Sequence, residues 1–224
     1  MPDMTRHLVE TADGSHSLYV PALDEHYHSR HGALQESLHV FLRMGWDALP
    51  RPAGVRRVLE IGFGTGLNAL LTAQAAAAAE WPTHYTGVEA YPLLPAEYQS
   101  LNYATQTGVN GADELLQDLH AAPWGVDVAV RPSFTLHKLE ARIEDFDLGV
   151  PVDLIYFDAF APDKQPELWT EAVFQRMHGM LAPGGVLTTY CAKGDVRRAM
   201  LAAGFRVEKV PGPKGKREML RAWR

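Results

Sequence analysis

The sequence predicts an α/β fold built on a mostly parallel sheet, with helices on both faces of that sheet. From residue 55 onwards, short apolar runs alternate with longer segments of helical periodicity, a pattern typical of strand–helix units. A glycine-rich segment joins the first apolar run to the first helix. The last two apolar runs have no helix between them, so they are expected to pair antiparallel.

Seven strands and five helices are expected in this domain, with Gly and Pro breaks setting their limits. The five parallel strands are placed at residues 57–61, 84–88, 134–139, 153–157 and 186–190, and the closing hairpin pairs 205–210 with 218–223. The helices are placed at residues 67–80, 96–106, 111–119, 166–180 and 196–203.

Residues 1–54 are interpreted as an N-terminal extension before the main domain, which spans residues 55–224. A short strand is expected at residues 17–20, after an Asp-Gly turn. A helix is expected over residues 33–49, because its leucines and a phenylalanine recur on one side.

Composition places the chain among ordinary globular proteins. Its 224 residues suit one domain with an extension, and its single cysteine, Cys191, excludes an internal disulfide and indicates a reducing compartment. There is no apolar run of the roughly 20 residues that a membrane span requires, and the first residues lack a signal-peptide pattern. The protein is therefore expected to be cytoplasmic.

Charge is distributed unevenly along the chain. The net charge is −6, yet residues 193–224 hold ten Lys or Arg and three Asp or Glu, which is +7. The remaining residues hold eleven basic and twenty-four acidic side chains, which is −13. Such asymmetry is typical of an end that faces a polyanion, although a solvated basic tail would show the same pattern.

The segment from Glu60 to Gly66, Glu-Ile-Gly-Phe-Gly-Thr-Gly, follows a strand and opens a helix. In the dinucleotide fingerprint, such glycines and the helix N-terminus meet a pyrophosphate, but here the third glycine comes one residue early. A carboxylate at Glu60 would repel pyrophosphate and would suit a ligand with an amino group. The pattern therefore resembles the first motif of class I methyltransferases that use S-adenosylmethionine (SAM), and the expected SAM contacts are Glu60, Gly62, Gly64, Thr65, Gly66 and Asn68.

Two further acids end predicted strands. Glu89 follows the second strand, where an acid can accept hydrogen bonds from ribose hydroxyls, as it also does in NAD enzymes. Asp158 follows the fourth strand, which lies next to the first in a doubly wound sheet. There it could contact the cofactor and accept the proton that an amine loses before it takes a methyl group.

Other candidate residues surround Asp158 in the sequence or carry positive charge. Phe160 and Pro162 are expected to form substrate-binding walls, although plain loop packing would explain Phe160 equally well. Lys164, Lys216 and Arg217 could contact phosphates, or simply lie in solvent. No metal site is expected at His26, His28 and His31, because no cysteine or aspartate at zinc-like spacing accompanies them.

Taken together, these motifs resemble the MnmC-type tRNA methyltransferases. Residues 156–169 are similar to that family's signature, in which a strand-end aspartate precedes Phe-Ala-Pro, a lysine, a proline and a tryptophan. Similarity also covers residues 62–68 and 216–220, Glu89 with residues 91–93, and the N-terminal residues 27–29 and 34–41.

The resemblance implies a Rossmann-like, class I SAM-dependent methyltransferase. It implies methylation of the aminomethyl nitrogen of 5-aminomethyl-2-thiouridine at the tRNA wobble position, with the anticodon arm as partner. The basic C-terminal part would then meet the RNA locally. Because the sequence stops just after the final strand, the resemblance points to the stand-alone branch, which lacks the flavin-dependent oxidase domain of bifunctional members.

The same resemblance assigns residues. Asp158 lies at the acceptor amine, and Tyr27 and Glu36 belong to the N-terminal segment that covers the active site. Arg142 departs from the family pattern, which often has an aspartate there for the adenine amino group, so the adenine contact stays open.

Three other hypotheses remain. The first is a SAM-dependent methyl- or aminopropyltransferase acting on a small amine, against which the basic C-terminus argues. The second is a non-catalytic SAM-binding module that recruits a partner enzyme. The third, a nicotinamide oxidoreductase, is disfavoured by the glycine spacing.

Overall fold

The computed structural model describes residues 5–224, so the first four residues of the predicted extension lie outside the described part. Its main feature is an eight-stranded sheet with the order β10-β11-β9-β8-β4-β5-β7-β6. The strands β4 (Arg56–Ile61), β5 (Thr83–Glu89), β7 (Phe134–Glu140), β8 (Val152–Phe157) and β9 (Leu181–Thr189) run parallel. The predicted α/β class and the adjacency of the first and fourth parallel strands are both confirmed.

The expected seven-stranded count was wrong by one strand. β6 (Asp127–Arg131) pairs antiparallel with β7 at the edge of the sheet. Its five residues, Asp-Val-Ala-Val-Arg, are at least partly exposed, so the segment lacks the apolar run that marked the buried strands. The C-terminal hairpin of β10 (Arg206–Pro211) and β11 (Glu218–Trp223) forms as predicted.

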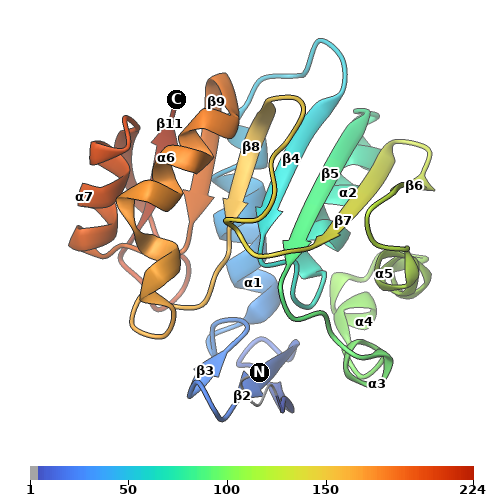
Figure 1. Ribbon diagram of the computed structural model, residues 1–224. Helices are drawn as coiled ribbons and strands as arrows, with labels where there is room; N and C mark the ends of the chain where they lie inside the picture. Colours follow the sequence, from blue (N-terminus) through green and yellow to red (C-terminus); the bar gives the residue numbers. More distant parts are fainter. Residues whose placement is uncertain (1–4) are drawn as a thin grey trace.

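Helices cover both faces of the sheet (Figure 1). One apolar core packs α2 (Leu67–Ala79), α5 (Ala112–Ala121) and the N-terminal helical segment against one face. A second core packs α6 (Glu171–Met180) and α7 (Gly194–Ala202) against the other. The parallel strands are therefore buried on both sides, which explains their continuous apolar runs.

The extension forms a small antiparallel sheet and one helical segment. The sheet holds β1 (His7–Glu10), β2 (His16–Val20) and β3 (Glu25–His26), and it lies beneath the carboxyl ends of β4, β5 and β8 (Figure 1). The helix expected over residues 33–49 is instead three pieces: α1 (Ala33–Ser37), a π-helical stretch η1 (Leu38–Arg43) and a 3₁₀ turn η2 (Trp46–Ala48).

Two other predicted helices are divided. In place of 96–106 there are α3 (Pro95–Tyr98) and α4 (Tyr103–Thr107), separated near Asn102. The Asn102 side chain accepts a hydrogen bond from the His16 amide (2.8 Å) and donates one to the Gly14 carbonyl (2.9 Å). This asparagine therefore ties the extension to the domain where the helix breaks. In place of 166–180 there are a 3₁₀ turn η3 (Pro166–Trp169) and α6, for which Thr170 is the N-cap.

Candidate cofactor and acceptor site

A cavity of about 850 Å³ opens at the carboxyl ends of β4, β5 and β8. Its walls come from the five loops that follow β4, β5, β7, β8 and β9, from residues 25–30 and Glu36 of the extension, and from the tip of the β10–β11 hairpin. Most of the predicted site residues line it: Tyr27, Glu36, Gly62, Gly64, Thr65, Asn68, Glu89, Asp158, Phe160, Pro162, Lys216 and Arg217.

Three predicted residues are placed elsewhere. Glu60 is fully buried and does not line the cavity, and Gly66 is the N-cap of α2. Lys164 lies outside the lining, with its ammonium 3.6 Å from the Asp24 carboxylate. Cys191 lines the cavity as a buried thiol.

The glycine loop touches the loop that follows β8 and begins at Asp158. Gly62 has φ +89°, and a Cβ added there would lie 2.5 Å from the Asp158 carbonyl oxygen. The Asp158 amide donates to the Ile61 carbonyl at 2.9 Å, which holds the two loops side by side. Only glycine suits this backbone conformation and close approach.

One asparagine joins the buried carboxylate of Glu60 to the partly buried carboxylate of Asp158. The Asn68 amide nitrogen donates to Glu60 Oε1 and to Asp158 Oδ2, each at 2.8 Å. Tyr85 donates its hydroxyl to Glu60 Oε2 at 2.7 Å. Burial raises the pKa of Glu60 well above its usual range, although these two hydrogen bonds oppose the shift. Glu60 therefore acts on the cavity through Asn68.

Glu89 organises the other side of the glycine loop. Its Oε2 accepts a hydrogen bond from the Gly64 amide (2.9 Å) and its Oε1 accepts one from the Tyr91 amide (2.8 Å). Each carboxylate oxygen can accept further bonds, and the side chain lines the cavity. This geometry suits a ligand that offers two hydroxyl donors.

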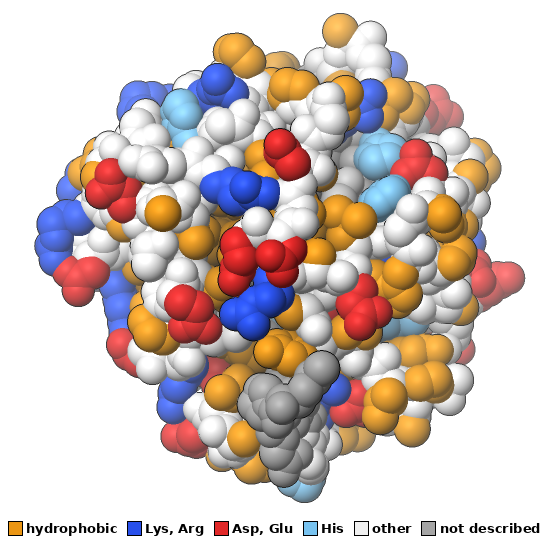
Figure 2. Space-filling view, viewed as in Figure 1, with side chains coloured by type: hydrophobic (Ala, Val, Ile, Leu, Met, Phe, Trp, Pro, Cys, Tyr) orange, Lys and Arg blue, Asp and Glu red, His pale blue; other side chains and the backbone are white. Residues whose placement is uncertain are grey.

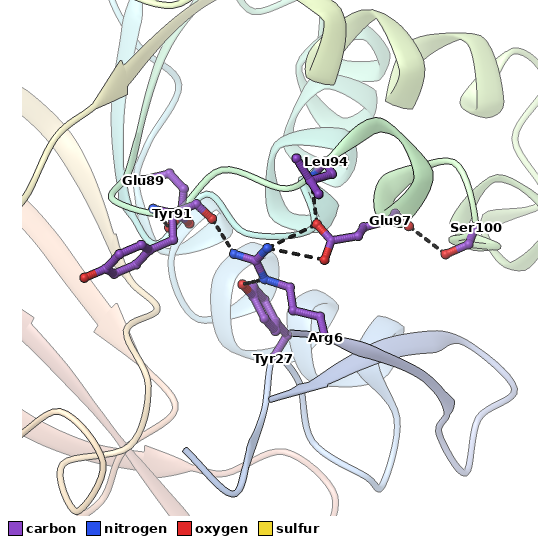
Figure 3. Close-up of polar contacts among 7 residues, drawn as sticks. All are labelled: Arg6, Tyr27, Glu89, Tyr91, Leu94, Glu97 and Ser100. Carbon is purple, nitrogen blue, oxygen red and sulfur yellow. Dashed lines mark hydrogen bonds and ion pairs between the residues drawn. The ribbon is translucent and has the colours of Figure 1, made fainter. Parts of the chain in front are cut away.

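Arg6 fastens the extension over this loop, and the sequence analysis did not identify it. Its guanidinium donates to the Tyr27 hydroxyl (2.8 Å), to the Tyr91 carbonyl (2.6 Å) and to the Glu97 carboxylate (3.1 Å), as Figure 3 shows. The side chain is only 5% exposed. No motif marks this arginine, because its partners are 21 to 91 residues away.

Tyr27, held by Arg6, forms one wall of the cavity. A Cβ added at Gly64 would meet the Tyr27 ring at 3.0 Å. The ring also meets Phe160 edge to face, with centroids 5.1 Å apart. The extension and the loop after β8 therefore share an aromatic wall.

Thr65 is held by two histidines, of which His28 is buried and His120 is partly buried. His28 contacts the Thr65 hydroxyl at 2.7 Å, and His120 contacts its carbonyl at 3.0 Å. Burial lowers the pKa of each histidine to about 4, so both are neutral at pH 7.

Within residues 5–224, no group of three or more His, Cys, Asp or Glu could hold a metal.

Asp158 has an unusual protonation equilibrium. Burial, followed by the nearby charge of Glu36, raises the pKa of Asp158 to about 8. The hydrogen bond from Asn68 and the positive charge of Lys216 act in the opposite direction. The carboxyl group can therefore take and release a proton near neutral pH.

Arg142 lies beside the cavity and is exposed. Its Nε is 3.1 Å from Glu144 Oε1, and both residues line the cavity. The Arg142–Glu144 ion pair therefore lies in the loop after β7, where the family pattern often has an aspartate. Within the described chain, no helix is both long and apolar enough to cross a membrane.

Comparisons with known proteins agree with this geometry. Residues 125–224 match a family described as S-adenosyl-L-methionine-dependent methyltransferase. The tRNA 5-methylaminomethyl-2-thiouridine biosynthesis bifunctional protein MnmC of Chromobacterium violaceum is 34% identical over 209 residues, covering 88% of this chain and 32% of that protein. The protein of the same name from Ectopseudomonas mendocina is 36% identical, covering 87% and 31%. The chain spans about a third of the length of these curated relatives.

Solved structures show the same likeness. The crystal structure of MNMC2 from Aquifex aeolicus superposes with a TM-score of 0.78 at 26% identity, over 98% of this chain and 70% of that one. Spermidine synthase from Thermotoga maritima superposes with a TM-score of 0.51 at 12% identity, over 98% of this chain and 71% of that one, which shows the fold alone.

The fold and the cavity define a class I SAM-dependent methyltransferase. Within that class, the chain is an MnmC-like methyltransferase domain.

The residues present fit SAM. Asn68 Oδ1 is buried without a hydrogen-bond partner among the described residues, and Asn68 lines the cavity. This acceptor suits the α-amino group of SAM, and Glu89 suits its ribose. Gly62 and Gly64 have left-handed backbone conformations and carry no Cβ atoms, so a ligand can approach the loop closely at these two residues.

Replacing Gly62 by Ala should disrupt the site. The new Cβ would meet the Asp158 carbonyl, and a left-handed φ at a non-glycine residue alone costs about 1–3 kcal/mol. We expect a lower melting temperature and loss of SAM binding, measured by thermal unfolding and calorimetric titration. Gly54→Ala is the control, because no atom lies within 4 Å of its Cβ position. Unchanged SAM affinity in Gly62→Ala would contradict this account.

Replacing Asp158 by Asn should change how stability depends on pH. Below about pH 3.8 the carboxyl is protonated whether the chain is folded or unfolded. As pH rises towards 8, the unfolded state ionises first, so the free energy of unfolding of the wild type falls. The stability advantage of Asp158→Asn should therefore grow between about pH 4 and pH 8.

Thermal unfolding of ligand-free protein across this range tests the effect. Asp145→Asn is the control, since Asp145 is exposed in the loop after β7. A constant difference in melting temperature between Asp158→Asn and the wild type at all pH values would show that the carboxyl is not perturbed.

Proposed function

We propose that this chain transfers a methyl group from SAM to the aminomethyl nitrogen of 5-aminomethyl-(2-thio)uridine at the wobble position of tRNA. The observation that carries the proposal is the position of Asp158 against the glycine loop, 2.8 Å from Asn68 and with a pKa near neutrality. The relatives named for 5-methylaminomethyl-2-thiouridine biosynthesis support the substrate.

Asp158 is the proposed proton acceptor. Bound SAM would supply an electrophilic methyl group carried on a sulfonium sulfur. The acceptor is an ammonium at neutral pH and has no free lone pair, so it must first give one proton to the Asp158 carboxylate. The lone pair then forms the new N–C bond as the methyl group leaves sulfur with no electron pair, which yields a secondary ammonium and a neutral thioether.

Other residues have proposed binding roles. Gly62, Gly64 and Thr65 would hold the amino-acid part of SAM, and Glu89 its ribose hydroxyls. Phe160, with Tyr27 and Pro162, would form walls for the modified uracil. All of them line the same cavity, and the wall made by the extension supports the proposal that residues 1–54 cover the active site.

Positive charge near the cavity supports contact with RNA. Many C-terminal cations are already paired, as Lys209 is with Glu218 and Arg221 with Glu208. Lys214 and Arg217 are exposed on the hairpin tip, and neither forms an ion pair within 4 Å among residues 5–224. Figure 2 shows acidic and basic side chains intermixed over the visible face. We therefore propose a local phosphate contact at the tip rather than a broad basic surface.

The direct test is methyl transfer to tRNA that carries the aminomethyl group. Nucleoside mass spectrometry should show the gain of one methyl group on that nucleoside, while a free aliphatic diamine should remain unmodified. Asp158→Asn should lower turnover by roughly 10²–10⁴-fold while SAM still binds. Asp163→Asn, in the same loop but exposed and paired with Lys193, is the matched control. Absence of the methylated nucleoside with a SAM-binding preparation would refute the proposal.

A further inference from the structure

The ammonium group of Lys216 occupies a defined place inside the cavity. Its Nζ lies 3.4 Å from Glu36 Oε1, 3.5 Å from the Tyr190 carbonyl oxygen and 4.1 Å from the centroid of the Tyr190 ring. A carboxylate, a carbonyl and an aromatic face are the groups that bind an alkylammonium ion. Lys216, Glu36 and Tyr190 all line the cavity.

The Glu36 carboxylate and the Tyr190 ring are each positioned by a hydrogen bond to another part of the protein. Glu36, in α1, has its second carboxylate oxygen bonded to the Ser29 amide at 2.7 Å. The Tyr190 hydroxyl donates to the Ala159 carbonyl at 2.8 Å, which fixes the ring after β9. The carboxylate and the ring are thus positioned without any contribution from Lys216.

Lys216 is more exposed to solvent than the groups that it contacts. Its side chain is 36% exposed, whereas that of Glu36 is 9% exposed. It stands on the hairpin tip between β10 and β11, on a flexible four-carbon stem. It can therefore leave while the carboxylate and the ring stay in place.

This place adjoins the acceptor acid. The charges of both Glu36 and Lys216 act on Asp158, in opposite directions, and the charge of Asp158 acts on Tyr190. An ammonium group bound against Glu36 would therefore lie near the carboxylate that is proposed to take its proton.

We propose that Glu36 and the face of Tyr190 form the subsite for the ammonium group of the acceptor, and that Lys216 fills this subsite until an acceptor displaces it. The inference rests on the proposed function and deepens it, because it specifies an alkylammonium rather than a neutral nucleophile. The displaced Lys216 enters solvent beside Lys214 and Arg217, where a phosphate of the substrate can pair with it.

Occupation by Lys216 weakens the binding of any ammonium ligand that carries no phosphate. Such a ligand must displace a cation–π contact and a partly buried ion pair without a compensating new contact for Lys216. Removal of the lysine ammonium should therefore tighten this binding. Removal of the Glu36 charge should weaken it. A neutral ligand of the same shape should respond much less to either change.

The test uses propylammonium and propanol as probes, with binding followed by NMR titration of the isotope-labelled protein. Lys216→Met should bind propylammonium roughly tenfold more tightly than the wild type, and Glu36→Gln at least severalfold more weakly. Propanol affinity should be equal in all three proteins. Lys214→Met, which alters the neighbouring exposed lysine, is the matched control and should behave as the wild type.

Two outcomes would overturn the proposal. One is unchanged or weaker propylammonium binding by a folded Lys216→Met protein, with thermal unfolding as the check on folding. The other is an equal gain for propanol, which would show that Lys216→Met only enlarges the cavity. Because these titrations need neither SAM nor tRNA, they fail independently of the nucleoside assay. If the titrations confirm the ammonium subsite but the tRNA gains no methyl group, the subsite binds a different amine substrate.

Discussion

The bridge that Asn68 makes between Glu60 and Asp158 is the interaction on which the rest of the site depends. Two carboxyl groups from neighbouring strands approach one another in a buried region, which is unfavourable if both are ionised. One amide nitrogen satisfies an oxygen of each, at 2.8 Å. Asn68 stands in the first turn of α2, so the bridge also fixes where the helix begins and how the glycine loop turns.

Much of the site follows from sequence order, because parallel strands bring their carboxyl ends to one edge of the sheet. Glu89 and Asp158 each end an apolar run, and the structure brings both to the cavity as that rule requires. Glu60 illustrates the limit of the rule. It lies within β4 rather than after the end of the strand, so it is buried in the sheet and reaches the cavity only through Asn68.

Other parts of the site leave no local signal. Arg6 belongs to no sequence motif, and the contacts of Arg6, His28 and Lys216 are all with partners far along the chain, so the sequence could not predict these contacts. The histidines that flank Thr65 are neutral packing groups, so a search for metal ligands could not identify them. Asn102 lies within a segment that was predicted to be one helix, and nothing in the sequence indicates its two hydrogen bonds to the extension.

The contact between Glu36 and Lys216 has a consequence for when the site forms during synthesis of the chain. These residues are 180 positions apart, so the ribosome adds the lysine long after the glutamate. Until then Glu36 has no cationic partner, and the hairpin tip that closes this side of the cavity does not exist. Contacts at such separation form late, since a long loop must close first. A nascent chain would thus acquire its complete site only when its final hairpin has emerged.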